Sequence, residues 1–306
     1  MMLKAFTTEA QRHRENQNKR SRWLGVGVLP LCLCVSVVSF VFIPKSAQAQ
    51  SLPRPDHIVI VIEENHAYKQ IIGNDDAPYI NALAKRGMLF TQSYGVAHPS
   101  QPNYLALFSG STRGITGDVC PLELSGDNLA SALLAHGLSF ASYSESLPAA
   151  GAEDCVYGGY RRKHNPVADW KELAAMNLPF SALPKDFEKL PSVALVVPDQ
   201  RNDMHDGSIE QGDTWLAKNI EAYAQWAQTH NSLLIVTWDE DNGSAENRVA
   251  TIFVGSVVKR GSSAQRINHY NILRTIEEMY GLSYLNESAQ AKTIGDVWQP
   301  SGRAKK

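Results

Sequence analysis

A run of aliphatic, mostly β-branched residues from His57 to Ile62 (HIVIVI) constrains the fold of this chain most strongly. Successive side chains of a strand point to opposite faces of a sheet, so a run without polar alternation predicts a strand buried on both faces. Two more runs of this kind cover residues 193–197 (VALVV) and 232–238 (SLLIVTW). Strands buried on both faces are typical of parallel sheets.

The other periodic segments alternate between strand and helix along the chain. Further strands are expected at residues 88–94, 138–143 and 249–254, and helices are expected at 77–86, 104–108, 127–136, 213–230 and 270–280. This alternation predicts an α/β layer fold with a mainly parallel central sheet. The sequence contains no internal repeat and no low-complexity segment, so residues 50–300 are expected to form a single domain.

The N-terminal 49 residues have the pattern of a secretory signal peptide. A basic stretch ends at Arg22, an apolar run follows from Trp23 to Pro44, and small residues at Ala47 and Ala49 have the spacing that a signal peptidase recognises. We therefore expect cleavage after Ala49 and a secreted or periplasmic protein. The apolar run nearly reaches the length that spans a bilayer, so an uncleaved membrane anchor is the alternative. The last six residues, 301–306, are expected to be disordered.

The charge balance argues against a nucleic-acid partner. The whole chain carries 29 basic and 31 acidic residues, and residues 1–49 hold seven of the former and two of the latter. Removal of these 49 residues leaves 257 residues with a formal net charge of −7. A binder of nucleic acid usually shows a basic patch, and none is visible here.

Cys120 and Cys155 are the two cysteines that remain after cleavage, since Cys32 and Cys34 lie in the presequence. An even pair in an exported protein predicts a disulfide, which would close a loop of about 35 residues. Two free thiols are one alternative. A two-cysteine metal site is another, although no neighbouring histidine or cysteine has zinc spacing.

Polar clusters follow four of the expected strands. Glu63-Glu64-Asn65 follows the first strand, and Ser100 follows the second, in the segment HPSQPNY (98–104). Residues 202–206 (NDMHD) and 239–243 (DEDNG) follow two of the later strands. Each cluster alone is an ordinary turn or helix cap, and Ser100 alone is explained as the N-cap of a helix. Because the carboxyl ends of parallel strands share one edge of a sheet, where ligands bind, we expect all four clusters to meet there.

The side chains in these clusters suit phosphate-ester chemistry. Carboxylate, amide and hydroxyl oxygens are the ligands that hard divalent cations prefer. Such a cation would offset the repulsion between the carboxylates and lower the pKa of the Ser100 hydroxyl, which would make it a nucleophile. His164, His205 and His269 are the candidates for holding phosphoryl oxygens or protonating the leaving group.

The ordered set of motifs resembles the phosphoesterase family of bacterial and fungal acid phosphatases and non-haemolytic phospholipases C, and most of all its small secreted bacterial acid phosphatases. The resemblance rests on Ile58 to Asn65, HPSQPNY (98–104), NDMHD (202–206), WDED (238–241), and His269-Tyr270 leading into RTIE (274–277). It covers nearly the whole chain after residue 49.

The resemblance implies an alkaline-phosphatase-like α/β/α sandwich with Ser100 as a nucleophile that forms a phosphoserine. It implies a divalent metal, either Ca, Mg, Mn or Zn, held by Glu64, Asn65, Ser100, Asp239 and Glu240. His205 would be catalytic, and His269, His164 and Asp241 would bind the phosphate. Some members of the family have two aspartates where this chain has Asp239-Glu240, so Asp241 is the alternative to Glu240 as a ligand.

The expected activity is that of a secreted, metal-dependent acid phosphatase that acts on small-molecule or lipid phosphate monoesters. A phospholipase C-type phosphodiesterase or a phosphoinositide phosphatase is the alternative on the same site. A non-catalytic exported binding protein is the third hypothesis. No nucleic-acid partner is expected, and membrane contact is expected only through an uncleaved presequence.

Overall fold

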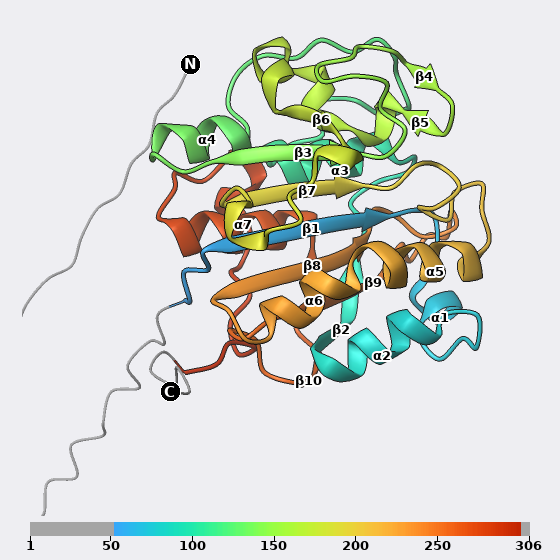
Figure 1. Cartoon of the computed structure of the whole chain (residues 1–306), viewed down its shortest axis with the longest axis vertical. Coiled ribbons are helices and arrows are strands. Elements are labelled where there is room, and N and C mark those ends of the chain that lie inside the picture. Colours follow the sequence, from blue (N-terminus) through green and yellow to red (C-terminus); the bar gives the residue numbers. More distant parts are fainter. Residues whose placement is uncertain (1–51, 301–306) are drawn as a thin grey trace, which may run out of the picture. The chain divides into compact units, whose positions relative to one another are not determined.

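The computed structural model describes residues 52–300 and is built on one large central sheet (Figure 1). The strands lie in the order β10-β2-β9-β8-β1-β7-β3-β6. The short strand β11 also pairs with β2, further along β2 than β10 does. Within the sheet only β9 runs antiparallel to its neighbours, β2 and β8, and every other pair is parallel. The mainly parallel sheet expected from the apolar runs is confirmed.

The strands are β1 (His57–Glu63), β2 (Met88–Tyr94), β3 (Phe140–Ser144), β4 (Val156–Tyr157), β5 (Tyr160–Arg161), β6 (Asn177–Pro179), β7 (Val193–Val197), β8 (Ser232–Trp238), β9 (Arg248–Val254), β10 (Gly261–Ser263) and β11 (Ile267–Asn268). The α-helices are α1 (Tyr68–Ile71), α2 (Pro78–Arg86), α3 (Gln101–Ser109), α4 (Leu129–Ala135), α5 (Ile209–Asn219), α6 (Glu221–Ala227) and α7 (His269–Tyr280). Short 3₁₀ segments are η1 (Arg162–His164), η2 (Pro166–Asp169), η3 (Lys171–Met176), η4 (Phe180–Ala182), η5 (Phe187–Lys189) and η6 (Asn286–Gln290).

Helices cover both faces of the sheet, as the unbroken apolar strands require. Along β1, Ile58, Ile60 and Ile62 pack into one core together with residues of α3, α4 and α7. Val59 and Val61 face the opposite way and pack with residues of α1, α2, α5 and α6. The two layers of helices lie on either side of the sheet in Figure 1. The architecture is therefore the α/β/α sandwich that the resemblance implies.

Two expectations about individual elements need correction. The segment 213–230 is not one long helix, because α5 begins earlier, at Ile209, and the chain breaks at Ile220 before α6. Ser208 caps α5, since its side chain accepts a hydrogen bond from the backbone N–H of Gln211. The break coincides with Asn219, whose side-chain amide donates to the carbonyl of Trp215, and with the φ of −113° at Ile220. The second correction concerns residues 145–166, where the sequence predicts no strand or helix, because they contain the β4–β5 hairpin and η1.

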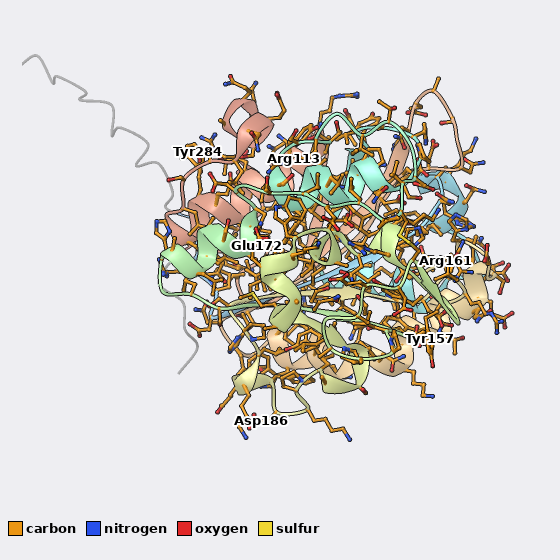
Figure 2. The ribbon with its side chains drawn as sticks, turned by 90° about the horizontal axis from the view of Figure 1, so that it is seen from above. Arg113, Tyr157, Arg161, Glu172, Asp186 and Tyr284 are labelled. Atoms are coloured by element: carbon orange, nitrogen blue, oxygen red, sulfur yellow. A yellow bond between two sulfur atoms is a disulfide. The ribbon has the colours of Figure 1, made fainter. Side chains whose placement is uncertain are left out.

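The predicted disulfide between Cys120 and Cys155 is present. It joins the loop after α3 to the residue before β4, where the hairpin exposes Val156 and Tyr157 (Figure 2). The same loop reaches the turn that carries Ser100, because Asp118 accepts a hydrogen bond of 3.1 Å from the N–H of Gln101. The disulfide therefore joins the loop after α3 to the segment before β4, close to the turn that carries Ser100.

Within residues 52–300 no helix has both the length and the apolar composition needed to cross a membrane. The expected signal peptide at residues 1–49 and the expected disordered tail at 301–306 lie outside the residues that the structure describes.

Removal of the disulfide is expected to lower the free energy of unfolding by about 2–4 kcal/mol, because the unfolded chain gains the freedom of an open loop. The Cys120→Ser, Cys155→Ser double variant should show this loss in denaturant unfolding. Reduced wild-type protein should match the variant, and the variant should not respond to reductant. Equal stability of the oxidised wild type and the variant would contradict the prediction.

Candidate active site

Polar side chains from six segments meet at the carboxyl edge of the sheet. Glu64 directly follows β1, and Asp239 directly follows β8, which is the parallel neighbour of β1. The last residues of these two strands, Glu63 and Trp238, lie opposite each other in the register. Glu64 and Asp239 are therefore placed side by side by the sheet itself, as the positions of the polar clusters predicted.

Ser100 stands immediately before α3, but its side chain does not cap the helix. Its hydroxyl instead donates to Glu64 Oε2 at 2.8 Å, and Glu240 Oε1 is a second acceptor at 3.2 Å. The residue is buried, with 1% of its surface exposed. The N-cap explanation for this serine therefore fails, and its oxygen lies among carboxylates as a nucleophile beside a base or cation would.

The turn before Ser100 is fixed by the side chain of Asn103. Its Oδ1 accepts hydrogen bonds from the backbone N–H groups of Val96 (2.8 Å) and Ala97 (3.1 Å). Its Nδ2 donates to the carbonyls of Ala97 (3.0 Å) and Pro99 (3.3 Å). Four hydrogen bonds of one buried amide thus fix the conformation of the turn that leads to Ser100.

Three buried carboxyl groups form the centre of the site. One oxygen each from Glu64, Asp239 and Glu240 lies within 4.8 Å of the other two. Burial raises the pKa of Glu64 well above its usual range, and the charge of Asp203 adds to this shift. Burial, followed by the charges of Glu64 and Glu240, also raises the pKa of Asp239 well above its usual range. The pKa of Glu240 is raised by burial, although its hydrogen bond with His98 opposes the shift.

The oxygen atoms at this centre fit a divalent cation. Asp239 Oδ2 and Asn65 Oδ1 are buried and have no hydrogen-bond partner. The backbone N–H of Asn65 points to Asp239 Oδ1 at 3.4 Å, and the positive φ of 54° at Asn65 turns the chain there. Buried oxygens without partners are costly unless something positive binds them. Hard oxygen donors of this kind are the ligands of Ca, Mg, Mn or Zn.

The two acidic residues after Asp239 take different positions. Glu240 reaches Ser100 and contacts His98 Nδ1 in a very short hydrogen bond. Asp241 instead accepts the backbone N–H of Ser244 at 2.7 Å and contacts the Ser244 hydroxyl. Glu240 is thus placed with the candidate ligands, whereas Asp241 closes the turn of its own loop. The positions favour Glu240 over Asp241 as a ligand.

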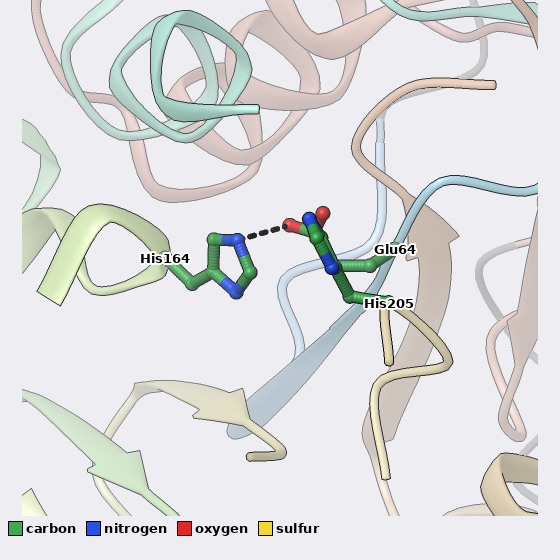
Figure 3. Close-up of side chains that lie close together, drawn as sticks. All are labelled: Glu64, His164 and His205. Carbon is green, nitrogen blue, oxygen red and sulfur yellow. Dashed lines mark ion pairs between the residues drawn. The ribbon is translucent and has the colours of Figure 1, made fainter. Parts of the chain in front are cut away.

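His164 lies on the other side of Glu64, at the end of η1 (Figure 3). Its Nε2 is 3.2 Å from Glu64 Oε1 and makes no hydrogen bond, while its Nδ1 is 3.1 Å from Asp203 Oδ2. The ring stacks on Tyr104 with 5.3 Å between centroids and 8° between planes. Burial lowers the pKa of His164 well below its usual value, and the positive charge of Lys163 lowers it further.

His205 and His269 approach the centre from two other segments. A ring nitrogen of His205 belongs with Glu64 and His164 to a second group of ligating atoms within 4.8 Å of one another. His205 is partly exposed, with 24% of its side-chain surface open to solvent. His269 begins α7 and donates from Nε2 to the backbone carbonyl of Asp239 at 2.6 Å, which leaves only its buried Nδ1 without a partner. Burial lowers the pKa of His269 to about 4.

Three residues of the site were not identified from the sequence. The phenol of Tyr104 donates to Glu64 Oε1 at 2.6 Å, so Glu64 is held from both sides by Tyr104 and Ser100. His98 contacts Glu240, and Asp203 contacts His164. All three belong to motifs that were noted, HPSQPNY and NDMHD, so their position in those motifs was the available signal.

Comparison with solved structures bears on the fold. A member of the alkaline phosphatase superfamily from Vibrio parahaemolyticus superposes with a TM-score of 0.55 at 12% identity, over 80% of this chain and 72% of that one. The lipoteichoic acid synthase LtaP from Listeria monocytogenes gives 0.56 at 10% identity, over 78% and 75%. Identities this low establish the fold alone, which agrees with the alkaline-phosphatase-like fold that the resemblance implied.

A family model narrows the class, since the model named "Phosphoesterase family" matches residues 73–283. The chain belongs to the phosphoesterase family. It is 47% identical over 254 residues to a phosphatidylinositol-3-phosphatase of Mycobacterium tuberculosis, covering 82% of this chain and 85% of that protein. It is 27% identical over 246 residues to an acid phosphatase of Aspergillus fumigatus, covering 72% of this chain and 54% of the fungal protein. The chain thus spans about half the length of that fungal relative. The prediction that this protein is a phosphoric ester hydrolase is confirmed by the family and by these relatives.

The substitution Asp239→Asn is expected to stabilise the metal-free protein and to abolish its stabilisation by a divalent cation. In the folded state burial and neighbouring charges hold the pKa of Asp239 above its unfolded value, so the folded protein binds the proton more tightly. The free energy of unfolding therefore falls as the pH rises and Asp239 loses its proton in the folded state. The variant should exceed the wild type by about 1–3 kcal/mol at pH 8, and by less at pH 6.

The measurement is denaturant unfolding at the two pH values, with chelator and with added cation. A cation at 100 times its Kd should stabilise the wild type by about 2.7 kcal/mol and leave the variant unchanged. Equal stabilisation of both proteins would show that the cation binds elsewhere. The comparison with wild type at each pH removes the effect of histidines that titrate in both proteins.

Proposed function

We propose that this protein is a metal-dependent acid phosphatase that hydrolyses phosphate monoesters through a phosphoserine on Ser100. The observation that carries the proposal is the position of the Ser100 hydroxyl, buried and hydrogen-bonded to Glu64 and Glu240 among carboxylates that fit a cation. The family match and the phosphatases among its relatives support the reaction class.

In the first half of the reaction, Ser100 Oγ attacks the phosphorus of the monoester. The proton of the hydroxyl passes to Glu64, which already accepts its hydrogen bond at 2.8 Å. The bond between phosphorus and the ester oxygen breaks, and the phosphoryl group remains on Ser100. His205, which reaches the solvent-exposed side of the site, gives its proton to the leaving oxygen.

In the second half, a water molecule attacks the phosphoserine. The water gives its proton to His205, the bond between phosphorus and Ser100 Oγ breaks, and the serine oxygen recovers its proton from Glu64. Inorganic phosphate leaves, and both side chains return to their starting protonation states. His164 and His269 each keep one buried ring nitrogen without a partner beside these groups, and Asp241 closes the loop next to the site.

A bound divalent cation would neutralise these carboxylates and lower the pKa of the serine hydroxyl, and the residues that would hold it are Glu64, Asn65, Ser100, Asp239 and Glu240. Because histidine side chains change charge in the weakly acidic range, a histidine acid favours turnover below neutral pH.

A phosphoinositide monoester is the second candidate substrate. The relative from M. tuberculosis carries the name phosphatidylinositol-3-phosphatase and is matched over 85% of its length. Export fits both candidates. The signal-peptide pattern of residues 1–49 and the disulfide between Cys120 and Cys155 are both typical of secreted or periplasmic proteins.

The Ser100→Ala variant is expected to lose turnover of an aryl phosphate by about 10³-fold or more, because the nucleophile is absent. The matched control is Ser109→Ala, a fully buried serine at the end of the same helix whose hydroxyl bonds to the carbonyl of Leu105. The control should keep kcat within about threefold of the wild type. Initial rates on folded, cation-loaded protein test this, and full activity of Ser100→Ala would disprove the mechanism.

A monoester is expected to be hydrolysed at least tenfold faster than a diester of the same alcohol, because the diester has a second alkoxy group in place of a charged phosphoryl oxygen that a cation would stabilise. The measurement compares an aryl phosphate with its bis-aryl diester and a soluble short-chain phosphatidylinositol 3-phosphate, on protein that lacks residues 1–49 and with chelator as control. A faster diester would support a phospholipase C-type enzyme instead. Silence on all three from folded, cation-loaded protein would support an exported binding protein.

A further inference from the structure

Asp203 is a buried carboxyl group that contacts three parts of the site and has no role in the reaction proposed above. None of its surface is exposed. Its backbone carbonyl accepts the N–H of Glu64 at 2.8 Å, which fixes the chain just after β1. Its two carboxyl oxygens go to the two histidines that flank Glu64. Asp203 thus contacts all three residues drawn in Figure 3, which are Glu64, His164 and His205.

The contact with His164 decides how that ring is oriented. Asp203 Oδ2 is 3.1 Å from Nδ1, and the stacked ring of Tyr104 prevents the imidazole from tilting. With Nδ1 bonded to the carboxyl group, Nε2 is the atom that faces Glu64 Oε1, at 3.2 Å. A carboxylate on one ring nitrogen sets both the orientation and the tautomer of a functional histidine.

The contact with His205 works through the backbone. Asp203 Oδ1 accepts the N–H of His205 at 2.8 Å, which closes a tight turn around Met204. Met204 has a φ of 78°, and its side chain is buried against α5. A Cβ at Gly212 of α5 would lie only 2.4 Å from Met204 Cγ. Met204 is therefore anchored in the core, while its two neighbours reach the site.

We propose that Asp203 is the positioning residue of this site: its carboxyl group orients the ring of His164, with Nε2 toward Glu64, and fixes the backbone turn from which His205 reaches Glu64. The proposal rests on the proposed function, in which His205 protonates the leaving oxygen and both histidines lie beside Glu64. Asp203 touches neither the serine nor the substrate, so its carboxyl group acts through the ring of His164 and the backbone of His205.

The substitution Asp203→Asn separates this role from simple packing, because it keeps the shape of the side chain. The asparagine oxygen can still accept the N–H of His205. Its amide group is a donor where the carboxylate was an acceptor, so it favours the His164 tautomer that has no proton on Nδ1. The proton then moves to Nε2, the atom that faces the site.

The test combines kinetics with nitrogen NMR of the histidine side chains at neutral pH, in cation-loaded protein labelled with ¹⁵N-histidine. In the wild type we expect a proton on Nδ1 of His164, assigned by the absence of its signals in His164→Gln. In Asp203→Asn we expect that proton to be lost, and kcat on an aryl phosphate to fall by about 10²-fold or more with KM changed by less than about threefold.

The matched control is Asp213→Asn in α5. Asp213 is also buried and accepts two backbone N–H groups, from Tyr79 and Ile80, but touches no histidine. We expect this control to keep the wild-type kcat and His164 tautomer even if its stability falls. Unchanged kcat and tautomer in folded Asp203→Asn would overturn the proposal.

Two outcomes keep the proposal testable in other circumstances. If Asp203→Asn does not fold, the wild-type spectrum decides, and a His164 without a proton on Nδ1 would overturn the proposal. If wild-type protein hydrolyses no phosphate ester, the proposed function fails, whereas the tautomer measurement still reports whether Asp203 orients the ring.

Discussion

The repulsion between carboxyl groups buried at one edge of the sheet is the constraint on which the site depends. Glu64, Asp239, Glu240 and Asp203 all lie in the interior, and burial raises the pKa of each. A single chain brings them together only because β1 and β8 pair along seven residues and end at the same level. Two large apolar cores hold that sheet in place, and their stability offsets the free-energy cost of burying these carboxyl groups.

The hydrogen bonds around the carboxyl groups link the site into one unit. Glu64 accepts from Ser100, immediately before α3, and from Tyr104 in the first turn of that helix. The ring of Tyr104 also stacks on His164, so one helix and its N-terminal residue contact Glu64 and support a histidine. A substitution at any of these positions therefore affects more than one function, and single effects are not expected to add.

The sequence predicted the sheet and the edge because both follow from local patterns. Unbroken apolar runs such as 57–62 predict strands with two buried faces, and polar residues after several of them converge by topology. The direction of β9 was not predicted, because an apolar run looks the same in either direction. The break at Ile220 was missed because amphipathic spacing continues across it. The contacts of His98 and Asp203 were missed because they join residues 142 and 39 positions apart.

The packing of Met204 against Gly212 has a consequence for how this site can vary. Gly212 lies on a helix that covers the opposite face from α3, and a methyl group there would also come within 2.9 Å of the carbonyl oxygen of Asn202. Any side chain at 212 would push the 202–206 loop outward and move both histidine contacts of Asp203. The position of the 202–206 loop thus depends on the absence of a side chain at Gly212, which lies outside the site.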